Sequence, residues 1–570
     1  FKNNFSFKLF YEKRVRRIFP LLFIVIITCL LFSWFILVPS DLKYFSKSSI
    51  FSALFISNYF FTIQDYFAFK SLLIPLLHTW SLSVEIQFYI LVSILIFLIF
   101  KYSKKNILII FSLIFLSSLI ISTLYSQINS IGSYYYIQFR IWEFLAGSFL
   151  AFSEIRNKKR IIFDKSTYNQ ITLFIGIFLV LLSIYFFDNK TLHPSYLTII
   201  PILGTCIIIW FSNENYLVTK ILSSKPLVSV GLISYSLFLW HYPIFAFYRY
   251  SYSTGNIYLK IIFFILLIII SIISYFLIEK PFRNKNIISF SSLKKFLITI
   301  FLLIIILNLI IIQKNGFNER YKIGKINLDM YHYVEELGKF RENNKNLKFT
   351  SSKKKILILG DSHGNDTYDA LILNKNLIKD FEVVFNKVDN LNFVLEHRDE
   401  NYKNKIYHFK KQINDANIVI LSYLWSKNLN NSNIELLKKF SKNLKKNNKK
   451  LIVISSPEFE ITGRFTFLDL FILKYKKIPK GKDKIELEKK YFRSYESNKD
   501  LINTNINLSN ISDVSTFIFL DLTQFLCNKL ERTCIFLTDN DEKIMFDDDH
   551  FTLSGSKFLG KKILSHSLFN

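Results

Sequence analysis

The chain has 570 residues, of which 51% are hydrophobic, and its mean hydropathy is +0.28. It carries a formal net charge of +29, although only 20% of its residues are charged. The length and the apolar content exclude a single soluble domain, and the many aromatic residues exclude a chain that is disordered throughout. Four cysteines exclude a disulfide-rich scaffold and an array of zinc fingers.

Long apolar segments dominate the first half of the chain. A helix of about 20 apolar residues can cross the hydrocarbon core of a bilayer, because all its backbone hydrogen bonds close internally. We predict nine such spans: 18–38, 82–100, 106–125, 138–153, 170–187, 197–212, 228–248, 257–278 and 294–313. The stretch 46–61 carries several serines and Asn58, and we interpret it as a peripheral or re-entrant piece.

The loop charges predict the orientation of these spans. With a cytoplasmic N-terminus, the inner segments hold most of the Lys and Arg residues of the loops, as the positive-inside rule requires. Nine crossings then place everything after residue 313 outside the cytosol. We predict a multi-pass protein of a bacterial inner membrane, with a C-terminal domain that is periplasmic or otherwise extracytoplasmic.

The second half has the pattern of an α/β domain. Short β-branched or aromatic runs occur at Ile356–Leu359, Val383–Phe385, Ile418–Leu421, Leu451–Ile454 and Phe517–Leu520, with helical spacing between them. Strands that alternate with helices indicate a parallel sheet covered on both faces. The predicted organisation is a membrane bundle over 1–313, a polar linker over 314–350 and an α/β domain over 351–570.

The sharpest chemical motif is Gly360-Asp361-Ser362-His363-Gly364, which follows a predicted strand. A serine at the start of the next helix meets unpaired backbone N–H groups and the positive end of the helix dipole, which can stabilise an oxyanion. Near the C-terminus, Asp547 and His550 are three residues apart, so the carboxylate can orient the imidazole that deprotonates Ser362. Taken separately, Gly-Asp-Ser is more often capping chemistry, and an aspartate run is more often a solvated face or a cation site.

These two motifs at the ends of one α/β domain resemble the SGNH/GDSL hydrolase family. The resemblance implies a three-layer α/β/α sandwich in which Ser362 is the nucleophile, His550 the base and Asp547 the residue that orients it. The middle motifs of that family, which supply a Gly and an Asn to the oxyanion hole, have no evident counterpart around Leu421–Trp425. The second oxyanion donor is therefore unidentified, although Asn430 and Asn431 lie nearby in the sequence.

Cys527 and Cys534 belong to this outer domain, with six residues between them. An oxidising compartment permits a disulfide there, and two unpaired buried thiols are the alternative. The sequence indicates no metal site.

The membrane half contains polar groups that are costly in lipid. Arg14 and Arg17, one helical turn apart, could clamp the phosphates of an acyl-carrying nucleotide or simply anchor the topology. The other candidates are His78 and Glu85 in His-Thr-Trp-Ser-Leu-Ser-Val-Glu, Arg140 and Glu143 at i and i+3, and His241 in Trp-His-Tyr-Pro. Arg140 and Glu143 could be only a structural pair, and Trp240-His241 could be an interfacial anchor.

Together with Glu279-Lys280-Pro281-Phe282-Arg283, these boxes resemble the membrane acyltransferase-3 family, in the branch with a C-terminal SGNH domain. The resemblance implies transfer of an acyl group, commonly acetyl from cytoplasmic acetyl-CoA, onto an envelope polysaccharide such as lipopolysaccharide O-antigen or peptidoglycan. The family's first two spans and a His in the first of them precede the Arg-rich segment and are missing, so we expect a truncated sequence. No bound cofactor is expected, and the oligomeric state is not predicted.

Two other functions remain open. The outer domain could act as a carbohydrate acetyl esterase, or the bundle could be a transporter or flippase with a non-catalytic outer domain. The expected partners are acetyl-CoA, the glycan acceptor and membrane lipid. Nucleic acid is not expected, because the basic residues follow one membrane face.

Overall fold

The computed structural model describes residues 6–63, 69–102, 106–157, 166–188, 191–251, 257–389, 391, 403–461, 465–514 and 517–565. The chain divides into two compact units, Phe1–Phe317 and Asn318–Asn570.

The first unit is helical within its described residues, and seven of its helical stretches are long and apolar enough to cross a membrane. These stretches are α1 (Phe7–Ile36), α4 (Thr79–Tyr102), α5 (Ile107–Ile128), α8 (Ser166–Phe186), α11 (Lys225–Ser251), α12 (Ile257–Ser274) with its continuation to Arg283, and α14 (Phe290–Gln313). The two other predicted spans, 138–153 and 197–212, are the shorter helices α7 (Ile141–Asn157) and α9 (Ile199–Phe211). All nine segments are thus helical, and the number that cross the bilayer stays a prediction.

The serine-rich stretch 46–61 lies within α2 (Pro39–Ala53), α3 (Ser57–Phe60) and the turn that follows. Its polar side chains face inward: Ser52 Oγ lies 2.7 Å from Thr79 Oγ1, and Ser57 Oγ lies 2.8 Å from Ser83 Oγ. These hydroxyls satisfy one another against α4, which is how polar groups are accommodated inside a helix bundle.

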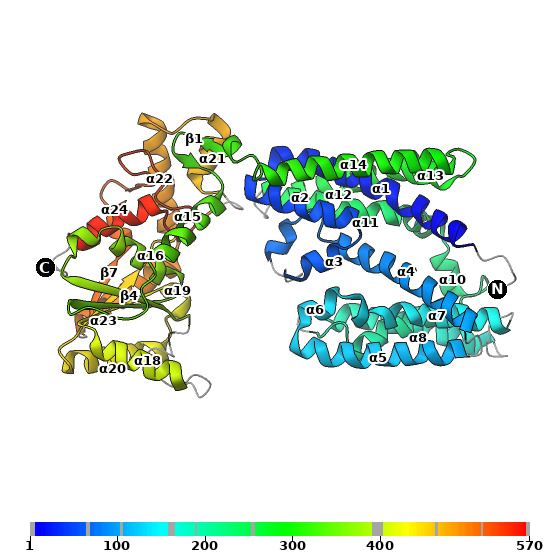
Figure 1. The fold of residues 1–570 in the computed structure, drawn as a ribbon, viewed down its shortest axis with the longest axis horizontal. Coiled ribbons are helices and arrows are strands. Elements are labelled where there is room, and N and C mark those ends of the chain that lie inside the picture. The colour runs from blue at the N-terminus through cyan, green and yellow to red at the C-terminus, as the bar shows by residue number, and fades with distance from the viewer. Residues whose placement is uncertain are drawn as a thin grey trace. The chain divides into compact units, whose positions relative to one another are not determined.

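The helices of the first unit form two groups. α1, α2, α11, α12 and α14 pack together, and so do α5, α7, α8 and α9, with α4 drawn between the two groups in Figure 1.

The second unit is built on a parallel five-stranded sheet with the order β4-β3-β5-β6-β7. The strands are β3 (Lys354–Gly360), β4 (Phe381–Lys387), β5 (Ile418–Tyr423), β6 (Lys450–Ser455) and β7 (Ile518–Asp521), which confirms all five predicted strands. β3, β5 and β6 are buried almost throughout, as expected for strands covered on both faces.

Helices cover both faces of this sheet. α15 (Met330–Asn343), α16 (Ser362–Ile372) and α24 (Leu553–Leu564) lie on one face, and α18 (Lys403–Asp415), α20 (Asn431–Lys446) and α23 (Lys499–Val514) lie on the other (Figure 1). This arrangement is the predicted three-layer sandwich. The strands place the C-terminal end of β3 and the start of α16 at one edge, where ligands of open α/β sheets bind.

The segment predicted as a polar linker differs from that prediction. Residues 318–343 hold the hairpin β1 (Lys322–Ile323) and β2 (Ile326–Asn327) followed by α15, and the second unit begins at Asn318. Tyr333 and Leu337, one helical turn apart, form an apolar stripe that packs against Phe546. Two apolar positions in a charged helix are a weak sequence signal. For this reason the composition of the segment predicts a linker and not a packed helix.

The Lys/Glu-rich stretch 462–500, which has the composition of a surface segment, contains α21 (Phe467–Tyr475) and α22 (Gly481–Ser497) in its described part. Tyr491 and Phe492 of α22 are buried, so this stretch is packed onto the unit.

Candidate active site

A tight turn at the end of β3 places Ser362 at the start of α16. A Cβ on Gly360 would lie 2.0 Å from the carbonyl oxygen of Ser422 in β5, so only glycine fits there. Asp361 caps the helix: one carboxylate oxygen accepts the N–H of His363 at 3.0 Å, and the other accepts the N–H of Leu424 at 3.1 Å. The turn is therefore fixed to the end of the neighbouring strand, and Ser362 is half-buried with no hydrogen bond from its Oγ among the described residues.

His550 lies in the loop before α24 and has its Nδ1 held by carboxylates. Nδ1 is 3.1 Å from Asp547 Oδ2, and the other oxygen of Asp547 accepts the backbone N–H of His550 at 2.7 Å. The predicted Asp547–His550 contact is thus present. Because Nδ1 is occupied, Nε2 is the nitrogen left to exchange a proton with a hydroxyl.

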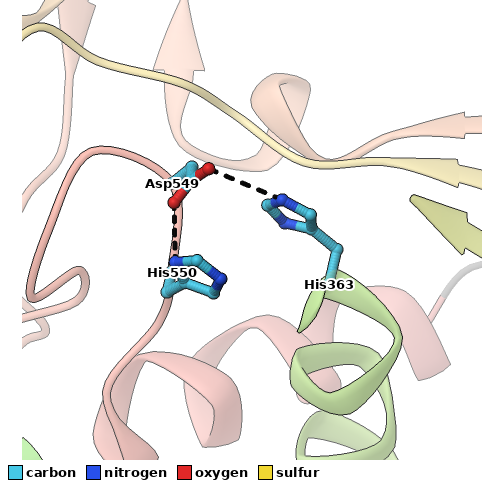
Figure 2. Close-up of side chains that lie close together, drawn as sticks. All are labelled: His363, Asp549 and His550. Atoms are coloured by element: carbon cyan, nitrogen blue, oxygen red, sulfur yellow. Dashed lines mark ion pairs between the residues drawn. The ribbon is translucent and has the colours of Figure 1, made fainter. Parts of the chain in front are cut away.

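Sequence reasoning missed a second carboxylate and a second imidazole at this point. Asp549 Oδ1 lies 2.6 Å from His550 Nδ1, and Asp549 Oδ2 lies 3.6 Å from His363 Nε2 (Figure 2). The two imidazole rings stack with centroids 5.0 Å apart and an interplanar angle of 7°. Since His363 directly follows Ser362, this stack places the residue after the predicted nucleophile against His550.

The charges around the two imidazoles shift their pKa values upward. Burial alone would lower the pKa of His550, but its bonds to Asp547 and Asp549 and the charge of Asp366 raise it. The pKa of His363 is raised in the same way, against its burial, chiefly by Asp549. In turn, the two imidazoles hold the pKa of Asp549 below its ordinary value although its burial opposes this.

Arg341 of α15 pairs with two aspartates of α16, the helix that begins at Ser362. Its guanidinium lies 3.0 Å from Asp366 and 2.7 Å from Asp369, both of which are buried in α16. Burial nevertheless raises the pKa of Asp366 to about 6 and that of Asp369 to about 7. Nothing in the sequence connects Arg341 with these residues, because it lies in the segment predicted as a linker.

The second oxyanion donor remains unidentified. Asn430 caps α20, its Oδ1 accepting the N–H of Asn433 at 2.9 Å, and Asn431 is the first residue of that helix. Asn428 donates to the carbonyl of Leu424 at 2.8 Å. These contacts show Asn428 and Asn430 in local bonds along the β5–α20 connection.

A cavity of about 460 Å³ lies between the end of α15, α16 and β4, and its lining includes Arg341, Asn365, Phe385 and Lys387. Lys387 is aligned with Gly360 in the sheet, and the ring of Phe385 lies 2.7 Å from where a Cβ on Gly364 would be. Asn365 is three residues after Ser362, which places both on one side of α16 about one turn apart. Asn365 is thus the lining residue that stands nearest to Ser362 along α16.

The structure joins Cys527 and Cys534 by a disulfide bond across the hairpin β8–β9 (Cys527–Asn528 and Thr533–Cys534). This pairing is the first of the two alternatives left open by the sequence.

In the first unit, two histidines from distant motifs come together. The ring of His78 is buried at the start of α4, with its centroid 5.5 Å from that of His241 in α11 and stacked on Tyr242 at 5.4 Å. His241 Nδ1 lies 2.7 Å from the carbonyl oxygen of Phe238. The His-Thr-Trp-Ser and Trp-His-Tyr-Pro boxes thus form one cluster.

A second cluster joins the Arg-rich segment to α4. The guanidinium of Arg14 lies over the rings of Phe10 at 3.5 Å and Tyr89 at 4.3 Å, and the hydroxyl of Tyr89 donates to Glu85 at 2.6 Å. Glu85 thus has the internal partner that its cost in lipid predicts. Arg17 is exposed, so one of the two predicted cations is available to a ligand.

Arg140 and Glu143 form a salt bridge at 2.9 Å, and Arg140 lies against the rings of Trp80 at 5.1 Å and Tyr134 at 5.3 Å. The pairing that their spacing suggests is confirmed.

A group that could hold a cation coincides with the site. The ligand atoms of His363, Asp549 and His550 lie within 4.8 Å of one another. Each oxygen of Asp549 contacts one of the two imidazoles, so the carboxylate has a partner on both sides without a cation.

The fold and site define a membrane protein with an SGNH-type second unit. Residues 1–280 match the family described as "Acyltransferase domain", and residues 332–565 match that described as "SGNH domain (fused to AT3 domains)". The chain belongs to the acyltransferase-3 family, in its branch with a fused SGNH domain.

Individual relatives agree with this assignment. The chain is 31% identical over 324 residues to O-acetyltransferase OatA of Staphylococcus aureus (strain MRSA252), a match that covers 54% of this chain and 53% of the relative. It is 29% identical over 303 residues to peptidoglycan O-acetyltransferase OatA of Listeria monocytogenes, covering 50% of this chain and 48% of the relative. The chain spans about half the length of these curated relatives.

Among solved structures, the periplasmic domain of the lipopolysaccharide acetyltransferase of Salmonella ser. Paratyphi A is similar, at 18% identity and a TM-score of 0.32. That match covers 42% of this chain and 97% of the Salmonella domain.

Proposed function

We propose that the chain is an O-acyltransferase that moves an acetyl group from cytoplasmic acetyl-CoA across the membrane onto an envelope polysaccharide. The observation that carries this proposal is the site of the second unit, where Ser362 begins α16 and His550 is held by Asp547. Membership of the acyltransferase-3 family and similarity to named O-acetyltransferases support it.

In the membrane unit, the exposed Arg17, with Arg14 one turn earlier, binds the phosphates of the donor at the cytoplasmic face. The cluster of His78 and His241 lies further along the bundle and takes part in passing the acyl group. Arg140 and Glu143 have a structural role, because each partner satisfies the other's charge.

In the outer unit, His550 takes the proton of Ser362 through Nε2 as the Oγ attacks the acyl carbonyl, and it gives this proton to the carrier as the carrier leaves. Asp547 holds the imidazole in the orientation this requires. A sugar hydroxyl then attacks the acyl-Ser362 intermediate, and its proton passes to His550 and from there to the Oγ of Ser362 as the new ester is released.

The acceptor lies in the cavity that Asn365 and Phe385 line. Phe385 offers an aromatic face to a sugar ring, and the amide of Asn365 offers hydrogen bonds one turn from the nucleophile. A glycan fixed there presents its hydroxyl to the acyl-serine at a high effective concentration, which is how transfer can win over hydrolysis by water. Peptidoglycan and lipopolysaccharide O-antigen are the two acceptor classes we propose.

Replacing Ser362 by Ala tests the proposal. The variant should lose at least about 10³-fold in the rate of glycan acetylation, because the covalent step is removed. Acetyl content of the purified envelope polysaccharide measures this, with Ser512→Ala as a matched control that should behave as the wild type, because among the described residues the Ser512 hydroxyl bonds only to the carbonyl of Ser509 within α23. Unchanged acetyl content in Ser362→Ala would refute the acyl-serine step.

A further inference from the structure

One carboxylate at the active site is shared between two imidazoles. Asp549 lies 2.6 Å from His550 Nδ1 through one oxygen and 3.6 Å from His363 Nε2 through the other (Figure 2). His363 is only 1% exposed, and its ring is stacked on that of His550. Within the described residues, these two imidazoles are the side chains that contact the carboxylate oxygens of Asp549 as ion-pair partners when protonated.

The second carboxylate, Asp549, favours the protonated form of His550, which cannot act as a base. Asp547 alone already holds Nδ1 and the backbone N–H of His550. A further uncompensated negative charge 2.6 Å from the same nitrogen stabilises the imidazolium, and an imidazole that is already protonated cannot take the proton of Ser362. A positive group on the far oxygen of Asp549 reduces that effect, and His363 occupies this position.

We propose that His363 is a positioning residue, which shares Asp549 with His550 and offsets the charge of that carboxylate, so that His550 stays available as a base. The proposal rests on the proposed function for the role of His550. It assigns a task to the residue that follows the nucleophile, separate from the helix-capping contact of its backbone N–H with Asp361.

Other carboxylates also face the two rings. From its own loop, His550 faces Asp547, Asp548 and Asp549. From α16, it faces His363 and Asp366, and Asp366 is paired with Arg341 of α15 at 3.0 Å. His363 faces Asp549, Asp366 and Asp361.

The test is the pH dependence of kcat/KM for hydrolysis of p-nitrophenyl acetate by the full chain in detergent. His363→Gln removes the positive partner of Asp549, so the acidic limb of the profile should move upward by about half to one pH unit, a roughly 3- to 10-fold loss of rate on that limb. Asp549→Asn removes the carboxylate itself, so the limb should move to lower pH. The double variant should follow Asp549→Asn, because His363 acts through that residue.

His332→Gln is the matched control, since it also removes an imidazole from the second unit but on the exposed side of α15. A merely structural role of His363 would lower the rate at all pH values without moving the limb. A limb that stays in place or moves downward in His363→Gln overturns the proposal.

A second readout does not depend on catalysis. Diethyl pyrocarbonate modifies neutral imidazole, and the half-buried His550 is more accessible to it than His363. The pH at which His550 becomes half-modified, measured by peptide mass spectrometry, should rise in His363→Gln and fall in Asp549→Asn. If the wild type shows no ester hydrolysis that depends on Ser362, the proposed function fails, while this titration still decides whether the carboxylate is shared.

Discussion

The two units bury charged groups in different ways. In the first unit, the short ion pairs Arg16–Glu12 (2.8 Å) and Arg140–Glu143 (2.9 Å) join residues of one helical stretch, four and three positions apart. In the second unit, Arg341 pairs with Asp366 and Asp369, and Lys543 pairs with Asp469, across segments that are far apart in the sequence.

The difference follows from the solvent in which each unit forms. A charged side chain on a helix in a bilayer is costly before that helix packs against other helices. A partner on the same helix can lower this cost as soon as the helix inserts. A soluble unit can leave its charges in water until the sheet closes, and only then pairs them over long distances. The long-range pairs of the second unit should therefore be the ones whose loss costs most.

The largest effect on stability is expected at Lys543. Its ammonium lies 2.7 Å from both carboxylate oxygens of Asp469, and both side chains are at most 2% exposed. Lys543→Met leaves Asp469 buried and unpaired, which should cost about 3–5 kcal/mol of unfolding free energy. Thermal unfolding of the full chain in detergent measures this. Lys477→Met, which breaks the exposed pair with Asp483 at 2.7 Å, is the control and should cost less than about 1 kcal/mol. Equal losses in the two variants would contradict the comparison.

A smaller effect is expected from pH. The pKa of Asp369 is raised to about 7 and that of Asp366 to about 6 in the folded unit, so the folded state keeps protons that the unfolded state has lost. The raised pKa values of His363 and His550 act with the same sign. The second unit should therefore lose stability as the pH rises from about 4 to 8.

The low pKa of Asp549 acts only below pH 4 and does not oppose this trend. Asp369→Asn should flatten the dependence of the melting temperature on pH. A melting temperature that rises between pH 5 and pH 8 in the unmodified chain would show that these carboxyl groups are not protonated when folded.

The smallest effect is expected at the local pair of the membrane unit. Arg140→Gln alone leaves Glu143 without its partner and should destabilise the unit by about 1 kcal/mol, whereas Arg140→Gln with Glu143→Gln should recover most of the loss. Melting in detergent and the rate of glycan acetylation both report it. If the double variant is stable but inactive, the pair has a chemical role and its structural interpretation is wrong.

Local features of the molecule could be predicted from the sequence, and long-range ones could not. The five strands follow from short β-branched runs, and the Arg140–Glu143 and Asp547–His550 contacts follow from spacings of three residues. The approach of His363 to Asp549 depends on how α16 packs against the C-terminal loop, which no spacing encodes.

The support of Asp366 and Asp369 by Arg341 depends on α15 being folded. The composition of this segment is that of a polar tether, so no sequence pattern predicts a cation there. Likewise, the cluster of His78 and His241 requires two helices whose contact becomes visible only in the folded bundle.

The central claim is that one serine of the outer unit carries the acyl group between donor and glycan. Inside-out membrane vesicles that contain the chain, supplied with labelled acetyl-CoA but no acceptor, allow the peptide with Ser362 to be recovered after an acid quench. The account predicts labelled acetyl on Ser362 that is lost when acceptor glycan is added and never forms in Ser362→Ala. Label that reaches the glycan at the normal rate in Ser362→Ala would contradict it.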